Sequence, residues 1–385
     1  MPEADEERQA LVDNLAASIY QQGAEANVIE DYRAAANHFL RIREVAPGSE
    51  IRANAEYDAA SALVRLEDWT QASAVLESFR RAFPDHELNS EATKQLASVY
   101  RRAGELGRAA TEYERVAAET DDPELRGEAL LLAGELHEDS DDIDAALSVY
   151  RRYVDEFPRP LDIAQETRFK MAGIYEDRGD LVVYHETLRE IVASDDSAGF
   201  DRTDRSRFLA AQSALVLTTQ FYDSFAEVEL VQPFDQSLAE KQRRMNTALE
   251  AFEGLVDYEV GEVTAAATYH IAEIYYGFSQ SLLESERPRD LDSAALVDYD
   301  LVLEEEAFPF EEQAIEVHEQ NFSLISAGVF NPWVQRSLDK LAALVPGRYA
   351  KSEISSGFIG SIDFFAYRAP NAPEIEAEVA SADVR

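Results

Sequence analysis

Histidine next to glutamate is the residue pair of this sequence best suited to chemistry. It occurs three times, as His137-Glu138, His185-Glu186 and His318-Glu319. A zinc hydrolase helix needs a second histidine four residues after the first, so that both imidazoles share one face. Those positions hold Asp141, Arg189 and Phe322. The three pairs therefore predict no zinc site.

Acidic residues are abundant, but their spacing does not form a standard site. An EF-hand counted from Asp139 needs glycine at its sixth position and glutamate at its twelfth, where Asp144 and Tyr150 stand. The run Glu304–Glu306 would spread around a helix instead of pairing as acid and base. The motifs GxxxxGK[ST] and GxSxG are missing. We predict no catalytic residue, metal or cofactor. One enzymatic alternative stays open, hydrolysis of a polysaccharide by two carboxylates about 5–10 Å apart.

The composition restricts the class of partner. The net charge is −41, and only five of the 35 basic residues are lysine. Such a surface repels nucleic acid and anionic lipid, because both are bound through Lys and Arg. No apolar stretch reaches 18 residues, which predicts no membrane insertion. Without cysteine there is no disulfide or thiol nucleophile. The partners expected are other proteins or peptides.

The histidine and acidic side chains considered above lie in a chain organised by a repeat of about 37 residues. Its anchor residues, separated by 37, 37, 37 and 38 positions, are Ala35, Ala72, Ala109, Ala146 and Tyr184. A period in this range indicates stacked supersecondary units. Each unit is predicted to hold two helices, such as 90–102 and 106–118 with Gly104 between them. Small residues twelve positions before the anchors should allow the two helices to approach closely: Ala60, Ala97, Gly134 and Ala172.

Three regions follow from this pattern. Residues 1–200 are predicted to form five repeats. Residues 201–350 should form irregular helical pairs that continue and cap the stack, with a helix break at Phe308–Phe310 because of Pro309. Residues 351–385 gather Gly, Ser, Ala and Pro, and we expect a mostly disordered tail there.

The order small residue, bulky residue, turn glycine, aromatic, alanine, aromatic and proline resembles the tetratricopeptide repeat over residues 11–196. The unit is three residues longer than usual, and "AFP" (82–84) and "EFP" (156–158) resemble the long-loop type of bacterial envelope proteins. The resemblance implies an all-α, right-handed solenoid that acts as a non-catalytic scaffold for protein–protein interaction. A purely structural spacer, its groove filled by its own tail, is the alternative.

The C-terminal half is similar to the end of large tetratricopeptide proteins of Gram-negative bacteria, labelled as gliding-motility related. The similar segments are residues 257–288, 304–321 and 341–349. This similarity implies a place in the periplasm, as part of a longer exported protein, with TonB/ExbB/ExbD-type envelope machinery as partners. Met1–Gln9 has no signal-peptide character, which leaves the cytoplasm as the alternative.

The resemblance also implies a binding groove, lined by the first helix of each repeat. Among the positions that usually line this groove, five hold residues suited to binding a peptide, and we call them the cationic set: Tyr57, Arg65, Lys94, Arg101 and Arg102. The same positions in later repeats hold mostly acidic residues together with one leucine and one phenylalanine. We call them the acidic set: Glu128, Leu131, Glu135, Glu138, Asp139, Glu166, Phe169, Glu176 and Asp177. We expect a groove that is neutral to basic at first and acidic later. The family's carboxylate clamp, which holds the C-terminus of a peptide, is not predicted here, because Asn14 and Ser18 do not provide the residues that it needs.

Overall fold

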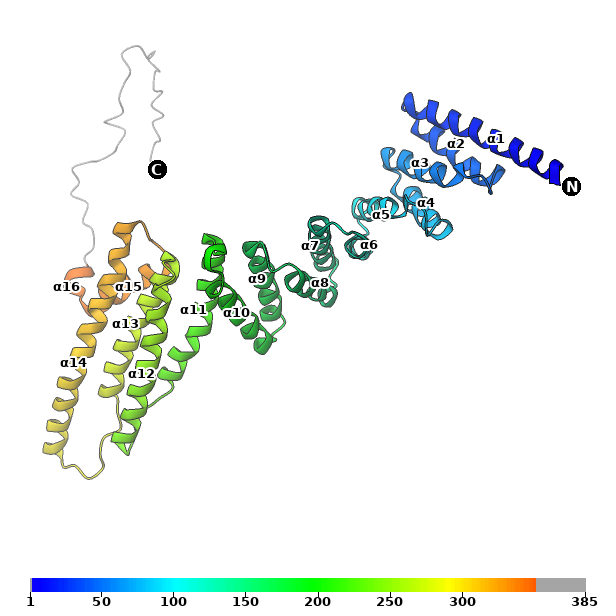
Figure 1. Ribbon diagram of the computed structural model, residues 1–385. Coiled ribbons are helices and arrows are strands. Elements are labelled where there is room, and N and C mark those ends of the chain that lie inside the picture. The colour runs from blue at the N-terminus through cyan, green and yellow to red at the C-terminus, as the bar shows by residue number, and fades with distance from the viewer. Residues whose placement is uncertain (1, 351–385) are drawn as a thin grey trace, which may run out of the picture.

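A computed structural model describes residues 2–350, and tail residues 351–385 lie outside that description. The described chain is helical, without strands (Figure 1). The helices of the repeats are α1 (Pro2–Val28), α2 (Tyr32–Val45), α3 (Ile51–Arg65), α4 (Trp69–Ala82), α5 (Asn89–Ala103), α6 (Leu106–Glu119), α7 (Pro123–Asp139), α8 (Ile143–Glu156), α9 (Leu161–Asp177) and α10 (Leu181–Asp196). Each packs mainly on its neighbours in sequence, so the predicted all-α solenoid is confirmed.

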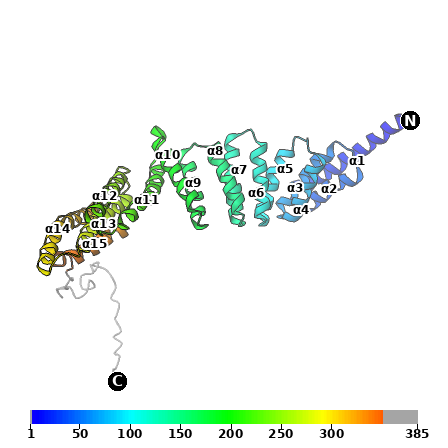
Figure 2. The same ribbon diagram turned by 90° about the horizontal axis from the view of Figure 1, so that it is seen from below.

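The stack is elongated and ends in a bundle of longer helices (Figures 1 and 2). These helices are α11 (Asp204–Ala226), α12 (Phe234–Val256), α13 (Gly261–Leu283), α14 (Ser293–Ser323), α15 (Pro332–Leu344) and the single turn α16 (Pro346–Tyr349). Short 3₁₀ turns lie at Gly199–Asp201 and Leu324–Ala327. The bundle has its own apolar core, in which Phe225, Phe252 and Phe278 are buried.

The anchors of the repeat lie in the core. Ala35, Ala72, Ala109 and Ala146 have no exposed surface, and Tyr184 is also buried. The small residues opposite them are buried too, so the helices of each pair do meet at these positions. Gly134 shows why size matters, because a Cβ built there would lie 2.7 Å from Cδ1 of the buried Tyr150 ring.

The turn between the two helices has one geometry in all five repeats. A residue with positive φ stands two positions before each second helix: Glu30, Glu67, Gly104, Asp141 and Gly179. The amide after it closes the turn; that of Asp68 donates to the carbonyl of Leu63 at 3.0 Å. Glycine fills this position only twice, and the glutamates and aspartate there adopt a conformation that costs an L-residue about 1–2 kcal/mol.

One predicted boundary is wrong. Pro309 lies inside α14 and does not separate two helices. A proline cannot donate to the carbonyl four residues earlier, which is the carbonyl of Glu305. Both Glu305 and Pro309 are exposed, so water can bind the freed carbonyl and the helix continues.

Candidate functional site

The first helices of the repeats (α1, α3, α5, α7, α9) and α11 form one row, which we call the first-helix face. Side chains connect neighbours along it: Gln95 on α5 donates to Ser61 on α3 at 3.2 Å, and Arg205 on α11 pairs with Glu166 on α9. The second helices (α2, α4, α6, α8, α10) form the other row, the second-helix face. Helix α11 therefore extends the first-helix face beyond the five repeats.

Tyr57 and Lys94 lie together in the middle of this face, on α3 and α5. Both are half-buried, and the Lys94 ammonium is 2.8 Å from the carboxylate of Glu91. Burial, together with Glu91, raises the pKa of Tyr57, while Lys94 acts in the opposite direction. The Tyr57 ring packs 6.1 Å from that of Phe79. These two residues of the cationic set are therefore neighbours.

The three arginines of the set lie apart from that pair, near the C-terminal ends of α3 and α5. Each is exposed, and its guanidinium lies over an aromatic ring of a second helix. The distances to the ring centroids are 5.3 Å for Arg65 and Tyr32, 6.0 Å for Arg101 and Tyr113, and 5.7 Å for Arg102 and Trp69. The cationic set is thus divided between the middle and the edge of the first-helix face.

A hollow of the first-helix face lies farther along, between α7, α9 and α11. Its larger part has a volume of about 470 Å³ and is lined by Leu131, Ile163 and Phe169 among others. A smaller part of about 110 Å³ lies beside Tyr184 and Val216. Phe169 lines both parts, and we call them together the Phe169 hollow. Ile163 is 40% exposed, Phe169 37% and Val216 38%, so apolar surface faces solvent here.

The rim of the Phe169 hollow is acidic. Its two cations are already paired, Arg205 with Glu166 and Lys170 with Glu138, the latter at 3.0 Å. Glu135 is exposed, also lines the hollow, and makes no ion pair within residues 2–350. Among the described residues, the Asp162 carboxylate accepts a hydrogen bond only from the adjacent amide of Ile163. A negative charge therefore remains beside the apolar surface.

The residues of the acidic set named from the sequence include Leu131, Glu135, Glu166 and Phe169, and all four line the larger part. Ile163 and Val216 were not anticipated. Ile163 lies outside the usual groove positions, and Val216 belongs to α11, beyond the last regular repeat. The exposure of Ile163 and Val216 is known only from the structure.

A serine, a histidine and a glutamate meet in the bundle, between α13, α14 and α15. Nδ1 of His318 lies 3.1 Å from the Ser337 hydroxyl, and Nε2 lies 3.2 Å from Glu273. Burial alone would raise the pKa of Glu273, but hydrogen bonds from His318 and Lys340 lower it below its ordinary value. His318 and Ser337 are 0% exposed, so a substrate cannot reach this cluster. Its evident role is to satisfy buried polar groups.

Two classes of site are missing from the described residues. Within 2–350, no group of three or more His, Asp or Glu side chains is arranged to hold a metal ion. Among the described helices, none combines the length and the apolar character needed to cross a bilayer.

Comparison with known proteins identifies part of the chain. The family model described as tetratricopeptide repeat matches residues 57–124 and 94–159. No curated protein matches the sequence. Similar solved structures include a tetratricopeptide repeat protein from Parabacteroides merdae (11% identity, 75% of this chain and 98% of that one, TM-score 0.31). Another is the TPR2AB-domain:pHSP90 complex of yeast Sti1 (13% identity, 69% of this chain and 99% of that one, TM-score 0.26).

Proposed function

We propose that this chain, which carries tetratricopeptide repeats over residues 57–159, is a non-catalytic scaffold that binds a segment of another protein on its first-helix face. The Phe169 hollow is the observation that carries the proposal. It combines exposed apolar side chains with a volume that accommodates one large side chain of a ligand. Binding would remove the apolar surface of Ile163, Phe169 and Val216 from water.

The charges around the hollow select the chemistry of the ligand. Glu135 and Asp162 carry the negative charge that is not compensated at the rim. A ligand with one apolar side chain flanked by Lys or Arg would fill the hollow and pair with these carboxylates. We therefore infer that the segment bound here is basic and contains at least one large apolar residue.

In this proposal, the cationic set determines in which direction the ligand lies along the first-helix face. Lys94 and the exposed Arg101 and Arg102 precede the Phe169 hollow along the stack. An acidic residue or C-terminal carboxylate of the same ligand would meet them by charge-assisted hydrogen bonds, with Tyr57 beside it. The basic part of the ligand would then reach Glu135.

We also propose that the assembly belongs to the bacterial cell envelope. The support is the similarity of residues 257–288, 304–321 and 341–349 to the envelope proteins described above. TonB/ExbB/ExbD-type machinery is the corresponding partner. Fractionation of the native cells tests the compartment, since recovery in the cytoplasmic fraction alone would contradict it.

A peptide library panned against the full chain tests the binding proposal. The enriched peptides should share a large apolar residue next to Lys or Arg. Phe169→Asp should weaken the best of them by about 10- to 100-fold, because burial of one aromatic side chain contributes about 1.5–3 kcal/mol. Isothermal titration calorimetry measures this change.

The matched control is Phe330→Asp, since Phe330 is an exposed aromatic residue outside the hollow. This variant introduces the same charge and should bind the peptide like the wild type. Equal losses in both variants would show that charge, not the hollow, controls binding. A library that yields no binding peptide would favour the structural spacer.

A further inference from the structure

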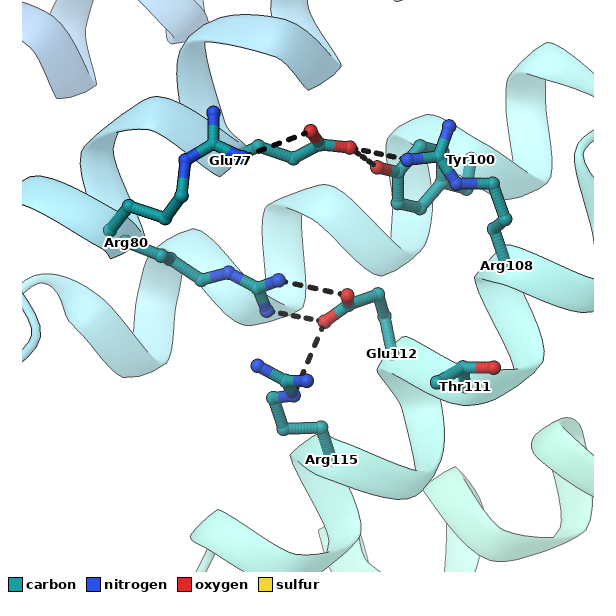
Figure 3. Close-up of a pocket in the computed structure, with 8 residues that line it drawn as sticks. Glu77, Arg80, Tyr100, Arg108, Thr111, Glu112 and Arg115 are labelled. Atoms are coloured by element: carbon teal, nitrogen blue, oxygen red, sulfur yellow. Dashed lines mark hydrogen bonds and ion pairs between the residues drawn. The ribbon is translucent and has the colours of Figure 1, made fainter.

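Four arginines gather on the second-helix face, in a cleft between α4 and α6. Arg80 and Arg81 come from α4, and Arg108 and Arg115 from α6. Two carboxylates, Glu77 and Glu112, lie among them. Figure 3 shows Tyr100 and Arg108 at Glu77, and Arg80 and Arg115 at Glu112. The cleft has a volume of about 460 Å³. We call it the arginine cleft.

Two of the arginines are engaged by the carboxylates. Both terminal nitrogens of Arg80 donate to Glu112, with Nη2 2.9 Å from Oε1 (Figure 3). Arg108 donates to Glu77 and, at 2.7 Å, to Glu105. Glu77 also accepts the hydroxyl of the buried Tyr100. These contacts fix the positions of Glu77 and Glu112 in the cleft.

The other two arginines have guanidinium groups available to a ligand. Arg81 is 74% exposed and approaches Glu77 only to 3.8 Å, while Arg115 is 48% exposed and approaches Glu112 only to 3.7 Å. Both distances exceed a hydrogen bond. Within residues 2–350, neither guanidinium has a hydrogen-bonded partner. The cleft thus presents two cations with unused donors, in a chain whose net charge is −41.

The repeat itself does not require charges at this place. One repeat away on either side, the position of Glu112 holds Val75 and Val149, and both are buried. In the two following repeats, the position of Arg80 holds the buried Ala117 and Val154. At the next boundary along the chain both positions are apolar (Ala117 and Val149), whereas the preceding boundary has the half-buried Arg43 opposite Val75. A buried ion pair is often no more stabilising than an apolar replacement. Folding of the repeat therefore does not require the Arg80–Glu112 pair at this boundary.

The surrounding charge selects a small anionic ligand. A long polyanion would contact the acidic surface around the cleft and be repelled, whereas a short segment can stay within the cleft, near Arg81 and Arg115. Carboxylates suit guanidinium forks, as the Arg80–Glu112 pair already shows. We propose that the arginine cleft binds a short acidic segment of a partner protein, with two neighbouring Asp or Glu side chains received by Arg81 and Arg115.

Fluorescence anisotropy with a labelled hexaglutamate peptide tests this second site on the full chain. An ionic strength of about 0.1 M limits repulsion from the rest of the surface to about 10 Å. We expect the wild type to bind, and Arg81→Gln/Arg115→Gln to bind at least about tenfold more weakly, because charge-assisted hydrogen bonds are lost. The exposed positions of both side chains leave the fold intact, which circular dichroism checks.

The matched control is Arg41→Gln/Arg152→Gln, which removes two charges from the positions of Arg115 in other repeats. It should retain the affinity of the wild type. Equal loss in the two double variants, or no binding by the wild type, would overturn the proposal. Binding of a phosphoserine peptide but not of hexaglutamate would overturn it in favour of a phosphate site. Loss of hexaglutamate binding in Arg101→Gln/Arg102→Gln would instead place the peptide on the cationic set of the first-helix face and overturn the proposal.

Discussion

Gly134→Ala tests the seam on which the repeat packing depends. Alanine normally stabilises a helix relative to glycine by about 1 kcal/mol. In α7, however, the added Cβ would lie 2.7 Å from Cδ1 and 2.9 Å from Cζ of Tyr150, where carbon atoms normally stay about 3.5–4.0 Å apart. The ring cannot easily move away. Tyr150 is 1% exposed, and its hydroxyl donates to Glu138 at 2.9 Å and accepts from Lys170 at 3.0 Å.

The magnitude follows from two opposing terms. Overpacking of a core costs about 1–3 kcal/mol, and the gain in helix propensity offsets about 1 kcal/mol of it. We expect Gly134→Ala to lower the free energy of unfolding by up to about 2 kcal/mol. Urea denaturation followed by circular dichroism measures the change.

Gly254→Ala is the matched control, because Gly254 lies in α12 with no atom within 4 Å of the added Cβ. It should raise the free energy of unfolding by about 1 kcal/mol, the propensity term alone. The difference between the two variants isolates the overpacking. Equal stabilisation by both would refute the close approach of α7 and α8.

Three further predictions concern single sites. Glu67→Gly should raise the free energy of unfolding by about 1 kcal/mol, because Glu67 has φ of 57° and glycine adopts that conformation without strain; a lower urea midpoint would contradict this. Arg80→Ala should cost about 1–3 kcal/mol by leaving Glu112 poorly paired, whereas Arg80→Ala/Glu112→Val, which copies neighbouring repeats, should recover most of that loss in thermal unfolding. Burial lowers the pKa of His270 although Glu273 is near, so the unfolded chain binds this proton more readily and wild-type stability should fall as pH drops below about 6.5. His270→Phe should lose less stability than the wild type in that range, and identical pH profiles would refute the assignment.

The repeat and its core could be predicted from the sequence, because the 37-residue period fixes which residues face the neighbouring helix. Gly104 and Gly179 indicated two of the turns. The equivalent turns at Glu67 and Asp141 could not be recognised, because these residues do not favour the positive φ that the turn's local backbone hydrogen bonds accompany.

The candidate sites were predicted only in part. The usual groove positions located Glu135 and Phe169, because both belong to regular repeats. Val216 could not be found in this way, as α11 joins the row after the period has ended. The arginine cleft combines residues of two repeats, so a reading of one repeat at a time does not place Arg81 near Arg115. Charged residues in apolar positions, such as Glu112, were the available signal.

Photo-crosslinking from position 169 tests the central claim most directly. Benzoylphenylalanine in place of Phe169 keeps an aromatic group in the hollow, and the same residue at position 330 provides the control. In native cells we predict crosslinks at 169 to a partner segment in which a large apolar residue lies next to Lys or Arg, with little product at 330. Equal yields at both positions, or crosslinked segments that are acidic, would contradict the assignment of the first-helix face as the binding site.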